Sequence, residues 1–210
     1  AMCMDKNITK KMLRDSGIPT ADWTIARSIE DIDYDKIEEM GYPVFIKPNS
    51  GGSSVATFKV ECREDVEDAV RAGLEVDDIV MIEAYLPGDE YTSFVLDGEV
   101  YPTIKISSPT GFFDFESKYS TGANAAKEEV VYLEKDLQDQ INKASKAVWD
   151  TFYCRAYVRA DFILSNGTFY VLELNTLPGM TPTSLIPRSA NAKGLSYSEL
   201  VDKIMETSLA

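Results

Sequence analysis

Two apolar segments near the carboxyl end, 159–164 and 169–175, constrain the fold of this chain more than any other feature. Each has the length and composition of a β-strand, and the turn residues Asn166 and Gly167 between them predict a hairpin. Side chains alternate between the two faces of a strand. The face that we expect to be polar carries Arg159, Asp161, Phe169, Val171, Glu173 and Asn175, and the face that we expect to be core carries Ala160, Phe162, Leu164, Tyr170, Leu172 and Leu174.

Polar groups on one side of an apolar hairpin need partners, because burying carboxylates is costly without cations or hydrogen bonds. Asp161, Glu173 and the amide oxygen of Asn175 suit Mg²⁺, a hard cation that takes oxygen ligands. The alternative, which the spacing favours about equally, is that Arg159 pairs with Glu173 across a solvated sheet face. The sequence therefore indicates either a metal site or an ion pair at this hairpin.

The register of the hairpin decides whether the two carboxylates can share a metal. A two-residue turn at 166–167 sets Asp161 opposite Leu172 and places Asp161 and Glu173 on opposite faces. A three-residue loop at 165–167 sets Asp161 opposite Val171 and leaves the carboxylates diagonal on one face, about 7–8 Å apart at the backbone. The metal site therefore predicts the three-residue loop, and a two-residue turn without a compensating bulge would exclude it.

A glycine- and serine-rich loop, 49–54, follows a predicted strand that ends in Lys47 and Pro48. Glycines let backbone N–H groups approach phosphate oxygens, serine hydroxyls add donors, and lysine adds positive charge. The segment matches neither a Walker A loop nor a GxGxxG motif. The loop is therefore a candidate phosphate flap, with an ordinary hairpin turn as the alternative.

Composition limits the chemistry and the partners. The chain has 210 residues, 44% of them hydrophobic, which is enough to bury a core. The 35 acidic and 21 basic residues give a net charge of −14, which disfavours nucleic acid, and no apolar run approaches the ~20 residues of a membrane span. Histidine is absent and the three cysteines have no metal or disulfide spacing. We expect a cytoplasmic enzyme that uses carboxylates, Lys, Arg, Tyr, Ser or hard metals.

The pattern of elements predicts an α+β fold made of two units, 1–88 and 89–210, which pack together and can hold a ligand between them. The helices are expected at 6–16, 63–73, 135–152 and 197–205, with strands at 42–48, 53–60, 78–86, 91–96, 99–106, 112–117, 157–164 and 168–175. The segment 176–196 is predicted to be irregular, because it contains Pro178, Pro182 and Pro187.

Two more segments can be interpreted either as functional or as ordinary structural elements. At the junction of the units, 83–86 could border a nucleotide base with Glu90 on ribose hydroxyls, or could be a buried strand before a solvated turn. The Lys118–Tyr119 pair lies in a region without strong periodicity, which is either a mobile catalytic loop or a connection.

Taken together and in this order, a set of short motifs resembles the D-alanine:D-alanine ligase family over essentially the whole chain. The motifs are Met4-Asp5-Lys6, Ile46-Lys47-Pro48, Gly52-Ser53-Ser54-Val55, Glu90-Tyr91-Thr92, Lys118-Tyr119, Arg159-Ala160-Asp161 and the run from Glu173 to Thr181. The final run is the most specific. The resemblance implies an ATP-grasp fold, in which two α+β subdomains clasp ATP.

By the same resemblance, ATP and two Mg²⁺ or Mn²⁺ ions are the cofactors. The resemblance implies that Asp161, Glu173 and Asn175 hold the metals, with Glu173 bridging. The ATP-binding residues that it implies are Lys6, Lys47, Ser54 and Lys118 at the phosphates, Glu83, Ala84, Tyr85 and Leu86 around adenine, and Glu90 on ribose.

The implied reaction joins two D-alanine molecules for peptidoglycan synthesis. The carboxylate of the first D-alanine attacks the γ-phosphate, and the amine of the second displaces phosphate from the acylphosphate. Arg159 and the Gly179 N–H would stabilise the tetrahedral oxyanion. Ser53 and Tyr119 would orient the substrates, and Asn175, Ser184 and Leu185 would bind them.

The chain also departs from the family pattern. Ala56 replaces a usual glycine, 127–133 lacks the usual proline and alanine, and little precedes the Met-Asp-Lys motif. We therefore expect a fragment without the family's amino-terminal domain, weak or inactive alone, whose partners are D-alanine, that domain and, as the resemblance allows, a second copy in a homodimer. The alternatives are another ATP-grasp carboxylate-amine ligase and a non-catalytic nucleotide-binding module.

Overall fold

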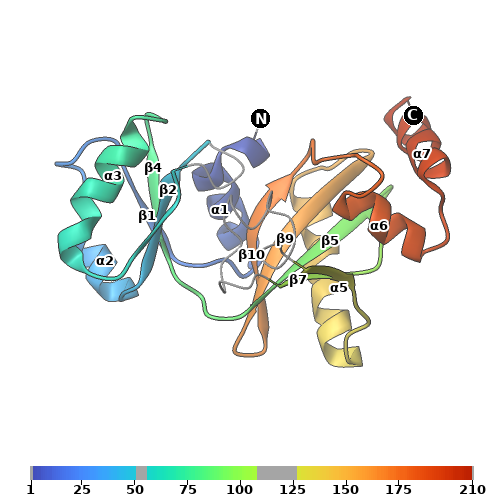
Figure 1. Ribbon diagram of the computed structural model, residues 1–210, viewed down its shortest axis with the longest axis horizontal. Coiled ribbons are helices and arrows are strands. Elements are labelled where there is room, and N and C mark those ends of the chain that lie inside the picture. The colour runs from blue at the N-terminus through green and yellow to red at the C-terminus, as the bar shows by residue number, and fades with distance from the viewer. Residues whose placement is uncertain (1, 51–55, 108–126, 210) are drawn as a thin grey trace.

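The computed structural model describes residues 2–50, 56–107 and 127–209 (Figure 1). Its helical elements are η1 (Met2–Met4), α1 (Lys6–Asp15), α2 (Tyr34–Met40), η2 (Arg63–Asp65), α3 (Val66–Leu74), α5 (Lys135–Thr151), α6 (Leu185–Ala192) and α7 (Tyr197–Leu209). Its strands are β1 (Trp23–Ala26), β2 (Val44–Pro48), β3 (Phe58–Val60), β4 (Val80–Ala84), β5 (Asp89–Leu96), β6 (Glu99–Val100), β7 (Ile104–Ser107), β8 (Lys127–Val130), β9 (Tyr157–Ser165) and β10 (Thr168–Asn175).

The first sheet has four strands in the order β1-β4-β2-β3, with antiparallel neighbours. Helices α2 and α3 lie on its outer side (Figure 1). Apolar side chains of the sheet and these helices, including Ile37, Val44, Ile46, Val70 and Val80, form one buried cluster. This cluster gives the first sheet a hydrophobic core of its own.

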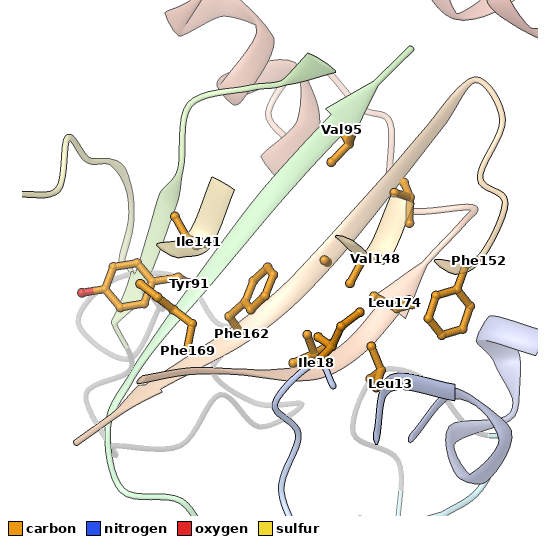
Figure 2. Close-up of a cluster of buried hydrophobic side chains, with 13 residues drawn as sticks. Leu13, Ile18, Tyr91, Val95, Ile141, Val148, Phe152, Phe162, Phe169 and Leu174 are labelled. Atoms are coloured by element: carbon orange, nitrogen blue, oxygen red, sulfur yellow. The ribbon is translucent and has the colours of Figure 1, made fainter. Parts of the chain in front are cut away.

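The second sheet has six strands, with β10-β9-β5-β7-β8 in order and β6 paired to β5. Helix α5 packs on one face, where Ile141 and Val148 meet apolar side chains of β5, β9 and β10 (Figure 2). Helices α6 and α7 pack through Ile186, Ala190 and Leu200 with residues of the other face. The sheet is therefore covered by helices on both sides.

Helix α1 connects the two halves. It lies between the sheets in Figure 1, and its Leu13 belongs to the buried cluster of the second sheet, together with Ile18 just after the helix (Figure 2). The two sheets fall on either side of residues 88–89, but α1, which 1–88 would assign to the first unit, places Leu13 in the core of the second sheet while Lys10 pairs with Glu83 of the first. The division into subdomains 1–88 and 89–210 stays a prediction.

Several expected elements differ in the structure. The expected strand 99–106 is interrupted at Pro102, which has no N–H for a ladder and lies between β6 and β7. The segment 176–196 was expected to be irregular, but it contains α6, because Pro187 lies in the first helical turn, where its missing N–H costs nothing. The strands β1 and β8 and helix α2 were not expected. The predicted strand 112–117 lies outside the described residues.

All three cysteines, Cys3, Cys62 and Cys154, are free thiols, which agrees with the expectation from their spacing. Among the helices of the described residues, none has the length and apolar character needed to cross a membrane.

Gly88 marks the close crossing from the first sheet to the second. A Cβ added there would lie 2.0 Å from the backbone oxygen of Leu164 in β9. Gly88→Ala therefore forces a backbone shift, and we expect the free energy of unfolding to fall by about 1–3 kcal/mol, measured in urea. Gly17→Asn is the control, because Gly17 has φ +70° and open space, which Asn tolerates. Equal losses in both variants would contradict the steric explanation.

Candidate functional site

The hairpin of β9 and β10 has a two-residue turn, so the predicted three-residue loop is wrong. Ser165 pairs with Thr168, and Asn166 and Gly167 both have positive φ, 48° and 78°, as a tight hairpin turn requires. The register then shifts between Val171 and Glu173. This β-bulge is the compensation that the metal site needs, because an extra residue in one strand changes which side chains face each other.

The bulge brings the two acidic residues directly opposite each other. Glu173 pairs with Asp161, and Asn175 pairs with Arg159. Directly paired residues have Cβ atoms about 4.5–5.5 Å apart. The carboxylates are therefore closer than the diagonal arrangement that we expected.

The same bulge corrects the expected faces. Phe169 and Val171 were expected on the polar face, but both are buried in the core together with Ala160 and Phe162. Figure 2 shows Phe169 beside Phe162. The extra residue at the bulge changes the phase of alternation, so that Leu174 joins that core beyond it. The polar face of β10 thus begins at Glu173.

Asp161 is held by donors from three strands. Arg159 donates from Nε to Oδ1 at 2.9 Å and from its terminal nitrogen to Oδ2 at 2.7 Å. Thr92 Oγ1 of β5 donates to Oδ1 at 2.6 Å, and Asn175 Nδ2 donates to Oδ2 at 2.9 Å. Burial would lower the pKa of the Arg159 guanidinium, but Asp161 raises it. Arg159 thus pairs with Asp161, not with Glu173 as the alternative interpretation had it.

The oxygen donors at the hairpin fit a hard cation. Asp161 and Glu173 offer carboxylate oxygens and Asn175 offers an amide oxygen, all three of them types that Mg²⁺ accepts, while the described residues hold no group of three or more Cys, Asp or Glu side chains that could bind a metal ion. Asn175 directs Nδ2 toward both carboxylates, at 2.9 Å from Asp161 and 3.5 Å from Glu173. The oxygen and nitrogen ends of a side-chain amide are nearly isosteric, so rotating the Asn175 amide by a half-turn would direct its oxygen toward a cation between the carboxylates.

On the first sheet, Glu83 of β4 lies buried between two lysines. Lys10 of α1 ion-pairs with one carboxylate oxygen, and Lys47 Nζ of β2 lies 2.5 Å from the other. Burial alone would raise the pKa of Glu83, but Lys10 and Lys47 lower it to about 2. Glu83 therefore stays ionised and fixes the Lys47 ammonium, whose side chain is partly exposed.

Asn49, directly after β2, positions the start of α1. Its backbone oxygen accepts from the Lys6 N–H at 3.1 Å, and its Oδ1 accepts from the Asn7 N–H at 2.8 Å. Burial and the nearby Lys47 lower the pKa of Lys6, while Glu173 raises it. Two lysines of the first half thus lie close together, and one of them is within electrostatic reach of the hairpin.

The remaining predicted residues are distributed around this centre. Ala84, Tyr85 and Leu86 are half-buried where the chain leaves β4, and Glu90 pairs with Ile106 and Ile163 in the second sheet. Ser53, Ser54, Lys118 and Tyr119 lie outside the described residues.

The start of α6 adjoins Arg159. Leu185, Arg159 and Thr92 line one shallow depression. Ser184 Oγ, at the N-cap of α6, accepts from the Thr181 N–H at 3.1 Å. A Cβ on Gly179 would lie 3.2 Å from Ser184 Oγ, so these two residues are close neighbours. The predicted substrate residues of 179–185 are therefore gathered at one edge of the hairpin.

Sequence reasoning missed Lys10 and Thr92. Lys10 lies one helical turn after Lys6, so their spacing predicts a shared helix face. Thr92 lies within the Glu90-Tyr91-Thr92 motif, to which a role was given only through Glu90. The contact of Thr92 with Asp161 depends on strand pairing that no local pattern reveals.

The two sheets, the helix between them and the paired carboxylates define an α+β fold of the ATP-grasp class. The chain belongs to the family described as D-ala D-ala ligase C-terminus, whose model matches residues 12–206. It is 49% identical over 210 residues to D-alanine--D-alanine ligase B from Clostridium perfringens, covering all of this chain and 69% of that relative.

Solved structures agree with this assignment. D-alanine--D-alanine ligase from Bacillus anthracis matches with a TM-score of 0.88 and 43% identity, over 99% of this chain and 68% of that one. The same enzyme complexed with ATP matches with a TM-score of 0.86 and 39% identity, over 99% and 66%. The chain thus spans about two thirds of the length of these relatives.

Proposed function

We propose that this chain carries the nucleotide site and catalytic centre of an ATP-dependent carboxylate-amine ligase that joins two D-alanine molecules into D-alanyl-D-alanine for peptidoglycan. The observation that carries this function is the bulge that sets Glu173 opposite Asp161, within electrostatic reach of Lys6. The names of the relatives, D-alanine--D-alanine ligases, and the ATP complex among them support the substrate assignment.

ATP would lie between the two sheets. We assign its phosphates to Lys6 and Lys47, because Lys6 at the start of α1 contacts the Asn49 oxygen just after β2, the strand that carries Lys47. Ser54 and Lys118, beyond the described residues, would complete this phosphate site. Adenine would contact 83–86 and ribose would contact Glu90. The ion pair to Glu83 supports this assignment for Lys47, because a tethered ammonium loses less freedom on binding phosphate.

Asp161, Glu173 and Asn175 would hold two Mg²⁺ or Mn²⁺ ions, which neutralise charge on the phosphoryl group in transfer. Arg159 is held rigidly by two bonds to Asp161, so its remaining donors are oriented toward the same face. With the Gly179 N–H it would stabilise the oxyanion of the tetrahedral intermediate.

The substrates would occupy the edge near the start of α6. Ser184, the Leu185 N–H and Asn175 would bind the second D-alanine, and Ser53 with Tyr119 would orient the reacting groups. A carboxylate nucleophile attacks without a general base, which suits a chain that has no histidine.

The cytoplasm is the proposed location, because ATP is the energy source there. A homodimer and the additional domain of the longer relatives are proposed partners.

The test is D-alanine-dependent release of ADP and formation of D-alanyl-D-alanine, with ATP and Mg²⁺, by the chain joined to the additional domain of the longer relatives. We expect both products in equal amounts, and little ADP with L-alanine. Mg-ATP binding without ADP release would favour the nucleotide-binding module. ADP release that requires another amino acid would favour a different ATP-grasp ligase.

A further inference from the structure

Lys10 is a buried lysine with contacts to both halves of the molecule. It is 1% exposed and ion-pairs with Glu83 of β4, although it lies on α1, whose Leu13 packs in the core of the second sheet. Its Nζ also donates to Thr20 Oγ1 at 2.7 Å. A buried ammonium is costly unless its hydrogens are satisfied, and these partners supply a charge and a hydroxyl.

Thr20 also contacts β10 at Val171, next to the bulge. Its Oγ1 donates to the backbone oxygen of Val171 at 2.9 Å. The Val171 N–H donates to the oxygen of Pro19 at 2.8 Å, and Thr20 forms a parallel bridge with Val171. Both backbone polar groups of Val171 are therefore held by the 19–20 segment.

Val171 is the last regularly paired residue before the bulge. Strand β10 is at the edge of its sheet, and the register changes between Val171 and Glu173. Bulged edge strands have unpaired backbone groups and bend easily. The contacts from Thr20 and Pro19 thus fix the position at which Glu173 turns toward Asp161.

A continuous path of polar contacts therefore joins the nucleotide side to the carboxylate side. It runs from Lys47 through Glu83, Lys10 and Thr20 to the oxygen of Val171. We propose that Lys10 and Thr20 are positioning residues, which fix the spacing between the Lys47 ammonium and the Glu173 carboxylate. Because this role rests on the proposed function, Mg-ATP affinity and turnover are measured separately.

The first variant is Thr20→Val, which keeps the branched shape and removes the hydroxyl. Loss of such a supporting contact behind a metal ligand costs about 10–100-fold in affinity or activity. We expect Mg-ATP affinity of the full chain, by calorimetry, to fall roughly tenfold with a parallel fall in kcat, and Thr20→Ser to restore most of both. Thr9→Val is the matched control, because Thr9 on α1 donates a buried hydroxyl to the Met2 oxygen, outside this path.

If Thr20 only stabilised the fold, Thr20→Val would lower the melting temperature and leave the Mg-ATP affinity of the folded protein unchanged. Unchanged Mg-ATP affinity in folded Thr20→Val, or equal losses in Thr20→Val and Thr9→Val, would overturn the positioning role. If the chain joined to the additional domain binds Mg-ATP but does not turn over D-alanine, the proposed function fails, while the affinity comparison still decides the role of Thr20. If D-alanine is turned over and Thr20→Val has the Mg-ATP affinity and kcat of the natural sequence, only the positioning role fails.

Lys10→Met tests the other member of the path. Residues in one network have non-additive effects. We expect the Lys10→Met, Thr20→Val double variant to lose no more Mg-ATP affinity than Lys10→Met alone, since the path is already broken. Additive losses from the two replacements would show that they act independently and would overturn the path.

Discussion

Glu173→Gln is expected to remove most Mg²⁺-dependent ATP binding while the fold persists. The side chain keeps its size and loses the charge that divalent cations need, and its neighbours on the core side are untouched. The loss of affinity should reach at least the ~10–100-fold typical of residues that only support metal ligands. Calorimetric titration with ATP, with and without Mg²⁺, measures the effect, and thermal unfolding checks the fold.

Glu99→Gln is the matched control for Glu173→Gln. Glu99 is a carboxylate of the same sheet that ion-pairs with Lys193, away from the hairpin. Without nucleotide, Glu173→Gln should melt at the same or a slightly higher temperature, because clustered carboxylates repel each other. Equal Mg-ATP affinity in Glu173→Gln and Glu99→Gln would show that Glu173 is an ordinary surface carboxylate.

The hairpin shows how far alternation alone can predict a site. The residue types for a metal site were evident, but the paired register depended on a bulge that local turn chemistry does not determine. The burial pattern changes phase between Val171 and Leu174, as an extra residue in a strand requires, but the unbroken apolar run 169–172 hides this change in the sequence. The one sign in the sequence was that Phe169 and Val171 fell on a supposedly polar face.

The lysines show a different limit. Helix α1 was predicted from its cap and its apolar residues, and it begins where expected, with Asp5 accepting from the Ile8 N–H. Lys10 looks like any solvated helical lysine, because its partner Glu83 is distant in sequence. Long-range charge pairing arises only when two sheets are placed around the helix, which no local pattern encodes. The resemblance to a known family assigned residues on the nucleotide side and on the carboxylate side of the site, but it gave Lys10 no role.

Glu83→Gln is expected to be the most destabilising single replacement at the site. It leaves Lys10, which is 1% exposed, without its counter-charge. Removing one partner of a buried ion pair costs about 3–5 kcal/mol of unfolding free energy, whereas replacing both partners can be nearly neutral. Urea unfolding at pH 7 measures the loss, and the Lys10→Met, Glu83→Gln double variant should recover most of it. Glu67→Gln, which breaks an exposed i,i+4 pair with Arg71, should change stability by less than about 0.5 kcal/mol.

The pH dependence gives an independent check on Glu83. Its pKa in the folded state is about 2, below the ordinary 4.5, so ionised Glu83 stabilises the folded state above pH 4.5. That contribution is lost as the pH falls from 4.5 toward 2, because the unfolded chain then binds a proton that the folded chain resists. The stability difference between the natural chain and Glu83→Gln should therefore be largest near pH 7 and shrink steadily below pH 4.5. A difference that stays constant from pH 7 to pH 3 would show that folding does not lower the pKa of Glu83 and that its charge does not stabilise the fold.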